Sequence, residues 1–299
     1  RRFLLMSTLR CGVIGLGAMG GPMALNLHHA GLLYRVWNRS PGPAQELSAA
    51  TGVVVADSPR ALADDCNVVL TCVSADKDVE EVIGSMSPGL AAGSIVVDTS
   101  TVSPRTAETL AARLAEIQVG FVDAPVSGGV EGARKGKLSV MAGGKSADIQ
   151  RIQPVLDTIS ARVTHMGPSG SGQATKAVNQ VIVGGIAEAV CEALALAEKL
   201  NLPPERLLSV LGAGAASSWF LEHRGASMLE DRFDEGFKLS LLLKDLKIIQ
   251  KLAQDLDIQM GVVESAIADF ERLVAAGEGN HDISGLIRLK RLPAGTAGG

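Results

Sequence analysis

Short apolar runs alternate with helical patterns along the first half of the chain. The runs occupy residues 11–14, 34–37, 68–73, 95–98, 121–124 and 139–141. Several are continuous in Val, Ile and Leu, which is typical of strands that helices cover on both faces. Strands alternating with helices predict strand–helix–strand units and a parallel sheet from residue 11 to about residue 167.

The pattern changes after residue 167. Apolar residues recur at helical spacing in 174–200, 204–211, 239–256 and 261–275, and no strand is indicated among them. We therefore predict an α/β fold, in which an N-terminal Rossmann domain with a doubly wound parallel sheet is joined by a long interdomain helix to a C-terminal all-helical domain.

The predicted boundary lies in the Gly-Pro-Ser-Gly-Ser-Gly segment at 167–172, where glycine and proline forbid a regular element and serine can cap a helix. The predicted domains are 10–168 and 169–291, and the tail at 292–299 is expected to be disordered because it has nothing to pack. Small residues in the helix after the boundary allow another helix to approach closely, so we expect this helix to form a subunit contact.

Composition narrows the class of protein. A chain of 299 residues can form two domains, and a net charge of −4 gives no attraction for nucleic acid or for an anionic membrane. The four cysteines stand singly, so we expect no metal site and a reducing, cytoplasmic compartment. Charged residues interrupt the most apolar stretch, 178–200, which argues against a membrane span. The basic, apolar start at 1–6 runs on into a glycine-rich motif and is interpreted as an extended start rather than a signal peptide.

That motif has the spacing of a dinucleotide-binding turn. Gly15, Gly17 and Gly20 follow the first apolar run and precede an Ala- and Leu-rich helical segment. In such a turn the first glycine permits the sharp bend, the second lets the backbone approach the pyrophosphate, and the third lets the helix pack on the strand. The predicted cofactor contacts here are Gly15, Leu16, Gly17, Ala18, Met19 and Gly20.

The end of the second predicted strand indicates which dinucleotide is bound. An NAD enzyme usually places an acidic side chain there, whereas this chain has Asn38, Arg39 and Ser40. Arg39 can lie against a 2′-phosphate, and the two polar neighbours can donate hydrogen bonds to it. We predict NADP as the preferred cofactor, with NAD possible; a solvated arginine in a turn is the simpler alternative.

Loops after other predicted strands supply further polar groups, because the carboxyl ends of parallel strands face the ligand crevice. The Ser127 hydroxyl with the backbone N–H groups of Gly128 and Gly129 can hold a carboxylate. Val73, Ser74 and Thr99 are predicted to contact the cofactor, and Ser100 lies near the same crevice.

Two polar groups interrupt the apolar helices. Lys176, Asn179 and Gln180 stand at positions i, i+3 and i+4, which places one ammonium and two amides on one helical face. A partly desolvated lysine can donate a proton to the oxygen formed when a carbonyl is reduced. Lys244 and Asp245 are oppositely charged neighbours in a second helix. They can form an ion pair that either closes over a ligand or lies exposed at the surface.

Taken together these segments resemble the β-hydroxyacid dehydrogenase family, which includes 3-hydroxyisobutyrate dehydrogenases, tartronate semialdehyde reductases and glyoxylate or succinic semialdehyde reductases. The resemblance runs from about residue 11 to residue 289. It is carried by GLGAMGGPMALNL at 15–27, DAPVSGG at 123–129 followed by GKLSVMAGG, GPSGSGQATKAVNQ at 167–180 and KDL at 244–246.

The resemblance implies hydride transfer between NADP(H) and a small 3-hydroxy acid or semialdehyde, at an active site between the domains. It also implies a homo-dimer or homo-tetramer. It implies Lys176 as the catalytic acid/base and Asn179 as a catalytic, substrate-orienting amide. Family members commonly carry a second asparagine where this chain has Gln180, so the amide that touches substrate stays open.

The remaining site residues follow from the same resemblance. It implies Ser127, Gly128, Gly129 and Asp245 as substrate-binding residues and Lys244 as a neighbour of the nicotinamide. Trp219 and Phe220 lie where members vary with substrate, although core packing accounts for them equally well.

Three other functions are alternatives for a chain with these motifs. Imine reductases share this architecture and use NADPH, but they usually lack the lysine. The 6-phosphogluconate dehydrogenases have a much larger helical domain. A non-catalytic NADP-binding interaction module is the third, and it is disfavoured by the intact Lys176 and by the absence of a basic tail. Selection among 3-hydroxyisobutyrate, tartronate semialdehyde, glyoxylate and succinic semialdehyde depends on pocket shape, which the sequence does not define.

Overall fold

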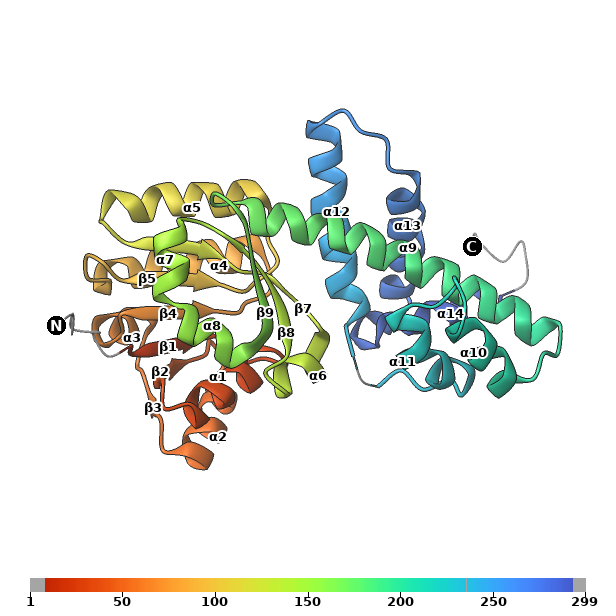
Figure 1. Ribbon diagram of the computed structural model, residues 1–299, viewed down its shortest axis with the longest axis horizontal. Helices are drawn as coiled ribbons and strands as arrows, with labels where there is room; N and C mark the ends of the chain where they lie inside the picture. Colours follow the sequence, from red (N-terminus) through yellow and green to blue (C-terminus); the bar gives the residue numbers. More distant parts are fainter. Residues whose placement is uncertain (1–8, 235, 293–299) are drawn as a thin grey trace. The chain divides into compact units, whose positions relative to one another are not determined.

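The computed structural model describes residues 9–234 and 236–292. Its backbone contacts divide the chain into two compact units, 1–176 and 177–299 (Figure 1). The division falls inside helix α9 (Ser171–Lys199), which begins in the first unit and continues into the second. The domain limits 10–168 and 169–291 stay a prediction. The tail predicted to be disordered lies, from residue 293 onward, outside the described residues.

The first unit is built on one nine-stranded sheet. Six strands pair in parallel in the order β3-β2-β1-β4-β5-β6, with the order reversing between β1 and β4. Their bounds are β1 (Cys11–Ile14), β2 (Leu33–Trp37), β3 (Val54–Val55), β4 (Val68–Thr71), β5 (Ile95–Asp98) and β6 (Gly120–Asp123). This reversal is the switch point at which the carboxyl ends of a doubly wound sheet leave a crevice for ligand.

The far edge of the sheet departs from the fully parallel arrangement that was predicted. β8 (Leu138–Gly143) runs antiparallel to β6 and to β7 (Val126–Ser127), and β9 (Ser160–Gly167) pairs in parallel with β8. The short hairpin of β7 and β8 reverses the chain direction there, because a connection this short cannot make the crossover that parallel strands need.

Successive residues of the central strands enter two separate cores, one on each face of the sheet. In β5, Ile95 and Val97 join one core and Val96 joins the other. Helix α1 (Gly20–His29) packs in the first core, whereas α3 (Pro59–Asp65), α4 (Asp76–Met86) and α5 (Pro104–Glu116) pack in the second. The other helices of the unit are α2 (Pro41–Thr51), α6 (Gly129–Arg134), α7 (Ser146–Arg151) and α8 (Gln153–Ile159). The predicted α/β class with helices on both faces is confirmed.

The described residues of the second unit contain helices and no strand, as predicted. α9, α10 (Pro204–Gly212), α12 (Leu239–Asp255) and α13 (Gly261–Ala275) match the four helical patterns. The apolar pattern did not predict α11 (Trp219–Leu229) or α14 (Leu286–Lys290). Phe220, Leu246, Phe270 and Leu286 contribute to one core that joins these helices.

Candidate functional site

The glycine turn between β1 and α1 has the shape that a dinucleotide requires. Gly15 has a φ of +91°, and a Cβ there would lie 2.2 Å from the carbonyl oxygen of Cys72. A Cβ on Gly20 would lie 1.9 Å from the carbonyl oxygen of Gly15, so the helix start fits against the turn only without a side chain. A Cβ on Gly17 would meet no atom within 4 Å, which leaves its backbone open to a ligand.

The helix start is suited to an anion. Met19 is the N-cap of α1 and gives no side-chain hydrogen bond to the first turn, and no acidic residue stands in that turn. Backbone N–H groups at such a helix end, together with the helix dipole, attract phosphate. These residues therefore fit the pyrophosphate of a nicotinamide dinucleotide.

Asn38 supports this turn from the end of β2. Its side-chain Oδ1 accepts a hydrogen bond from the N–H of Leu16 at 2.8 Å, and its Nδ2 donates to the carbonyl oxygen of Ser40 at 2.8 Å. These two hydrogen bonds compete with the predicted role of Asn38 as a hydrogen-bond donor to the 2′-phosphate, because the amide already links the glycine turn to the loop after β2.

Arg39 is exposed but has an acidic partner that sequence reasoning missed. Its Nη1 lies 2.9 Å from Oδ1 of Asp78, with side-chain exposures of 76% and 23%. Asp78 stands in the first turn of α4, 39 residues along the chain, so no local pattern indicates the pair. The carboxylate offsets part of the positive charge that a 2′-phosphate would meet.

The ends of β4 and β5 are joined by a buried hydroxyl network. Thr99 Oγ1 donates to the carbonyl oxygen of Thr71 at 2.7 Å, and Thr71 Oγ1 donates to Oδ1 of Asp98 at 2.7 Å. Ser100 Oγ accepts the N–H of Val73 at 2.9 Å. The hydroxyls of Thr99 and Ser100 therefore fix the strand ends, so Thr99 can offer mainly its backbone to a cofactor.

The structure brings Lys176 to the predicted carboxylate-binding loop. The lysine is 7% exposed, and its Nζ donates a hydrogen bond to the carbonyl oxygen of Val126 at 2.9 Å. Val126 directly precedes Ser127, and Gly128 and Gly129 follow with φ angles of +124° and +62°. The ammonium and the loop that can hold an anion are thus neighbours, although 50 residues separate them in the chain.

A second set of predicted residues comes together within the second unit. Asn179 Nδ2 donates to Oε1 of Gln180 at 2.8 Å, and Gln180 Nε2 donates to Oδ2 of Asp245 at 2.7 Å. Lys244 Nζ lies 2.8 Å from Oδ1 of Asp245. Gln180 and Asp245 are 2% and 3% exposed, so the chain of contacts is anchored in the protein interior. The placement of Ser74 as a cofactor contact stays a prediction.

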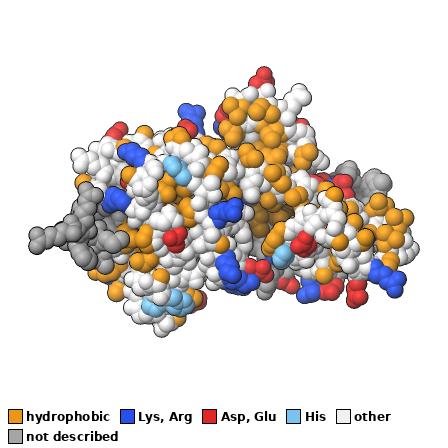
Figure 2. All heavy atoms as spheres, viewed as in Figure 1, with side chains coloured by type: hydrophobic (Ala, Val, Ile, Leu, Met, Phe, Trp, Pro, Cys, Tyr) orange, Lys and Arg blue, Asp and Glu red, His pale blue; other side chains and the backbone are white. Residues whose placement is uncertain are grey.

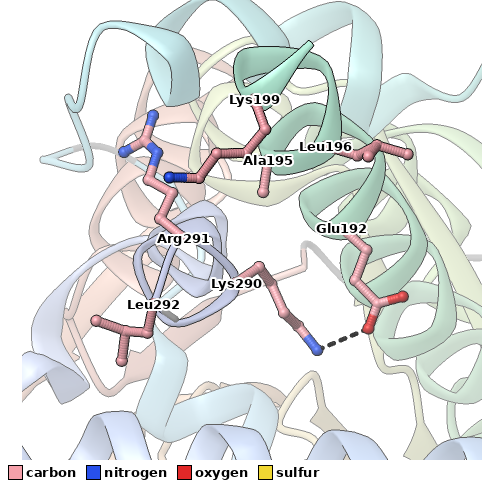
Figure 3. A pocket seen from close by; sticks show the side chains of 7 residues that line it. All are labelled: Glu192, Ala195, Leu196, Lys199, Lys290, Arg291 and Leu292. Carbon is pink, nitrogen blue, oxygen red and sulfur yellow. Dashed lines mark hydrogen bonds and ion pairs between the residues drawn. The ribbon is translucent and has the colours of Figure 1, made fainter. Parts of the chain in front are cut away.

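A cavity of about 500 Å³ in the second unit is lined by other residues (Figure 3). They are Glu192, Ala195, Leu196, Lys199, Lys290, Arg291 and Leu292. Two of its cations are paired with neighbouring acids, since Lys290 contacts Glu192 and Asp269 at 3.0 and 2.7 Å and Arg291 contacts Glu198 at 2.6 Å. None of the predicted site residues lines this cavity.

Two further features concern residues 9–234 and 236–292, the part of the chain that the structure describes. No group of three or more His, Cys, Asp or Glu side chains stands close enough to hold a metal ion. One helix, α9, is long and apolar enough to cross a membrane by length and composition, but half of its most apolar window is buried inside the protein. A core helix has the same properties, so this feature is weak support for a membrane span.

The doubly wound sheet and its glycine turn define a nicotinamide-dependent dehydrogenase. Residues 10–167 match the NAD-binding domain of 6-phosphogluconate dehydrogenase, and residues 170–290 match the NAD-binding domain of NADP-dependent 3-hydroxyisobutyrate dehydrogenase. The chain belongs to the 3-hydroxyisobutyrate dehydrogenase family of NAD(P)-dependent β-hydroxyacid dehydrogenases, as the resemblance predicted.

Individual relatives extend over almost the whole chain. The 2-hydroxy-3-oxopropionate reductase of Escherichia coli is 34% identical over 289 residues, covering 96% of this chain and 98% of that protein. The structure of Mycobacterium tuberculosis 3-hydroxyisobutyrate dehydrogenase with L-serine is 29% identical with a TM-score of 0.85, covering 95% of this chain and all of the other. The structure of Psf3 with NADP+ and 2-OPP is 27% identical with a TM-score of 0.87, covering 93% and 99%.

Proposed function

We propose that this chain interconverts a small 3-hydroxy acid and the corresponding semialdehyde with NADP(H), and that Lys176 moves the proton. The observation that carries the proposal is the hydrogen bond of the buried Lys176 Nζ to the Val126 carbonyl oxygen at 2.9 Å. This bond supports the proposal because the ammonium lies beside a loop of the first unit that combines the Ser127 hydroxyl with the N–H groups of Gly128 and Gly129.

The loop holds the carboxylate of the substrate. The hydroxyl of Ser127 and the N–H groups of Gly128 and Gly129 are donors, and the positive φ angles of both glycines turn consecutive N–H groups toward one side. Anchoring the carboxylate here sets the distance from the reacting carbon to Lys176.

Lys176 supplies and removes the proton. When bound, the nicotinamide gives or takes the hydride. In the reductive direction the Lys176 ammonium donates a proton to the oxygen that becomes the hydroxyl, and in the oxidative direction the neutral amine accepts it. The Val126 carbonyl holds the nitrogen in place, which reduces the loss of side-chain freedom when the substrate arrives.

Asn179 orients the substrate, and Gln180 supports Asn179. Both polar atoms of the Gln180 amide are engaged by Asn179 and Asp245, and its side chain is buried. Asn179 is only half-buried and stands one helical turn beyond Lys176, so its amide is the one available to a ligand. Lys244 holds Asp245 at the far end of the same chain of contacts.

NADP(H) is the preferred dinucleotide. The glycine turn and the uncapped start of α1 bind the pyrophosphate, while Arg39 and Ser40 bind the 2′-phosphate. The ion pair with Asp78 weakens this preference without reversing it, because most of the Arg39 side chain is exposed and can turn toward a phosphate. Comparison of KM for NADPH and NADH tests the preference; a lower KM for NADH would contradict it.

The substrate class is tested by NADPH oxidation with tartronate semialdehyde, methylmalonate semialdehyde, succinic semialdehyde and glyoxylate. The family relationship supports at least one productive aldehyde in this panel. Lys176→Ala should abolish that turnover while leaving the Kd for NADPH within about twofold, because the lysine acts on the reacting oxygen. Turnover at the wild-type rate in this variant would refute the assignment.

Two alternatives are distinguished when a cyclic imine is added to the same assay. An imine reductase would oxidise NADPH with the cyclic imine and with none of the aldehydes, and the presence of Lys176 argues against it. A non-catalytic NADP-binding module would bind NADPH but oxidise it with neither the imine nor the aldehydes.

We also propose that a second copy of the chain covers apolar side chains on the second unit. They include Val178, Ile182 and Leu196 on α9, Leu200 directly after it, and Leu256, Ile258 and Val262 around the turn from α12 to α13, each at least 55% exposed. Figure 2 shows apolar side chains at the surface over that turn. Light scattering should give a dimer or tetramer mass that Ile182→Glu lowers, while Val54→Glu on the first unit leaves it unchanged.

A further inference from the structure

The first turn of α9 is held by a buried carboxylate from the end of β6. Asp123 is fully buried, its Oδ1 accepts the N–H of Gly170 at 2.8 Å, and its Oδ2 accepts the N–H of Gln173 at 3.0 Å. Both oxygens of one side chain therefore cap one helix. A negative charge at the positive end of the helix dipole strengthens these bonds.

Gln173 fixes the same turn to a second strand. Its side chain is 1% exposed, its Nε2 donates to the carbonyl oxygen of Ser100 at 2.7 Å, and its Oε1 accepts the N–H of Val102 at 3.1 Å. Ser100 and Val102 lie in the loop that follows β5. The backbone of Gln173 is thus tied to β6 and its side chain to the loop after β5.

The first turn of α9 also packs closely against the strands of the sheet. A Cβ on Gly172 would lie 2.3 Å from the carbonyl oxygen of Met141 and 2.6 Å from that of Asp123. A Cβ on Gly143 would lie 2.5 Å from Oδ1 of Asp123. The backbone of the first turn of α9 therefore lies directly against β6 and β8, with no room for a side chain at Gly172.

The residue that this turn positions is Lys176. It follows Gln173 by three residues on the same helix, and its Nζ reaches Val126, three residues beyond Asp123. The segment from Asp123 to Val126 therefore holds both the start of the helix and the ammonium group that the helix carries.

We infer that Asp123, with Gln173, is a positioning residue for Lys176: by capping α9 it sets the placement of the ammonium beside Ser127. The inference rests on the proposed role of Lys176. In this role Asp123 contacts neither substrate nor cofactor and acts only through the position of the helix.

Asp123→Asn is the direct test. An amide has one acceptor oxygen and directs its NH2 group at a backbone N–H, so one of the two capping bonds is lost. We expect kcat at pH 8 to fall by about tenfold, with the Kd for NADPH within about twofold of wild type, because a small displacement of the proton carrier slows the proton transfer.

The pH profile separates positioning from a general loss of structure. Burial raises the pKa of Asp123 to about 6, opposed by the backbone N–H groups of Gly170 and Gln173. The titratable groups on the elements around it include Asp98 on β5, Glu108 on α5, His165 on β9, Lys176 on α9 and Asp148 on α7. A protonated Asp123 also loses one acceptor, so the ratio of wild-type to variant kcat should fall from about ten at pH 8 toward one below pH 5. A ratio that is constant with pH would overturn the inference.

Asp76→Asn is the matched control, because Asp76 Oδ1 caps a different helix. It accepts hydrogen bonds from Ser103 N–H at 2.9 Å and Thr106 Oγ1 at 2.6 Å at the start of α5. This variant should lose stability and keep the wild-type kcat and pH profile. Gln173→Leu is the second variant, and it should repeat the fall in kcat if Asp123→Asn does not fold.

A double variant distinguishes failure of the inference from failure of the proposed function. If Asp123 acts through Lys176, Asp123→Asn should cause no further loss in a Lys176→Ala background. A further tenfold loss there would show that Asp123 acts independently and would overturn the inference. Full activity of Lys176→Ala alone would instead overturn the proposed function.

Discussion

The Nζ of Lys176 donates a hydrogen bond to the carbonyl oxygen of Val126 at 2.9 Å, across 50 residues of sequence. Val126 lies on the two-residue strand β7, and the lysine lies on the first turns of α9. The bond joins the proposed proton carrier to the loop that is proposed to hold the substrate carboxylate.

Gly17→Ala should separate cofactor binding from folding. A Cβ at this position meets no protein atom within 4 Å, so the free energy of unfolding should change by less than about 1 kcal/mol. The methyl group nevertheless occupies the space in which the pyrophosphate approaches the backbone, so the Kd for NADPH should rise at least tenfold. Fluorescence titration and urea unfolding measure the two quantities.

Two glycine variants serve as references for that result. Gly42→Ala, on a helix where the new Cβ also meets no atom within 4 Å, should leave both quantities unchanged. Gly20→Ala should lower stability as well as affinity, because its Cβ would lie 1.9 Å from the Gly15 carbonyl oxygen. Unchanged NADPH binding in Gly17→Ala would place the pyrophosphate elsewhere.

Asp78→Asn should strengthen the preference for NADPH. The carboxylate lies 2.9 Å from the Arg39 guanidinium, and its removal leaves more positive charge for a 2′-phosphate. Since most of the arginine is exposed, the effect should be about two- to fivefold in KM for NADPH, with KM for NADH nearly constant. Arg39→Gln should act in the opposite direction. Equal changes in both KM values would indicate that the pair does not meet the 2′-phosphate.

Features that depend on neighbouring residues are predictable from the sequence, whereas features that depend on residues far apart in the chain are not. The turn at Gly15 and the helix after it follow from adjacent residues, and the structure agrees with that local pattern. β9 was missed because five of its eight residues are exposed and do not alternate with buried ones, so no apolar period marks the strand. Its existence follows from pairing with β8, which is information that the local sequence does not carry.

Side-chain partners were the least predictable part of the site. Helical spacing placed Asn179 and Gln180 on one face, but only the packing of α12 shows that Gln180 turns inward to Asp245. Asp123 stood in a recognised motif, yet its role as a cap depends on the position of Gly170, 47 residues later. Such contacts depend on tertiary packing rather than on spacing.

Exchanges at Asn179 and Gln180 should have different signatures. Gln180→Leu removes the hydrogen bond to the buried Asp245 carboxylate, which should lower the free energy of unfolding by about 1 to 3 kcal/mol. Asn179→Ala should change stability by less than about 1 kcal/mol and lower kcat at least tenfold, because its amide is proposed to orient the substrate. Thermal unfolding and steady-state kinetics test this, and the reverse pattern would make Gln180 the substrate-orienting amide.

The raised pKa of Asp123 predicts how stability varies with pH. Burial raises it from 3.8 to about 6, so the folded protein binds more protons than the unfolded chain between these values. The free energy of unfolding should therefore fall as pH rises through this window, by up to about 3 kcal/mol from this group. The fall should be smaller in Asp123→Asn, which has no carboxylate to ionise. Urea unfolding from pH 4 to pH 7 measures both slopes, and identical slopes would refute the prediction.

Lys290 joins three acidic side chains in the second unit, so its removal should be costly. Its Nζ lies 2.7 Å from Asp269 and 3.0 Å from Glu192, contacts Glu188 as well, and its side chain is 12% exposed. Lys290→Met leaves these carboxylates without their shared cation, which should lower the free energy of unfolding at pH 8 by about 3 to 5 kcal/mol.

The loss in Lys290→Met should shrink on acidification. Burial already raises the pKa of Glu188, with Lys290 opposing the shift, so removal of the lysine should raise that pKa further. A protonated Glu188 no longer repels its neighbours, and the difference from wild type should be clearly smaller at pH 5 than at pH 8. Lys251→Met is the control, because its pair with Asp255 is 76% and 60% exposed and should contribute less than about 0.5 kcal/mol. If both lysine variants lose the same stability at both pH values, the buried cluster has no special electrostatic role.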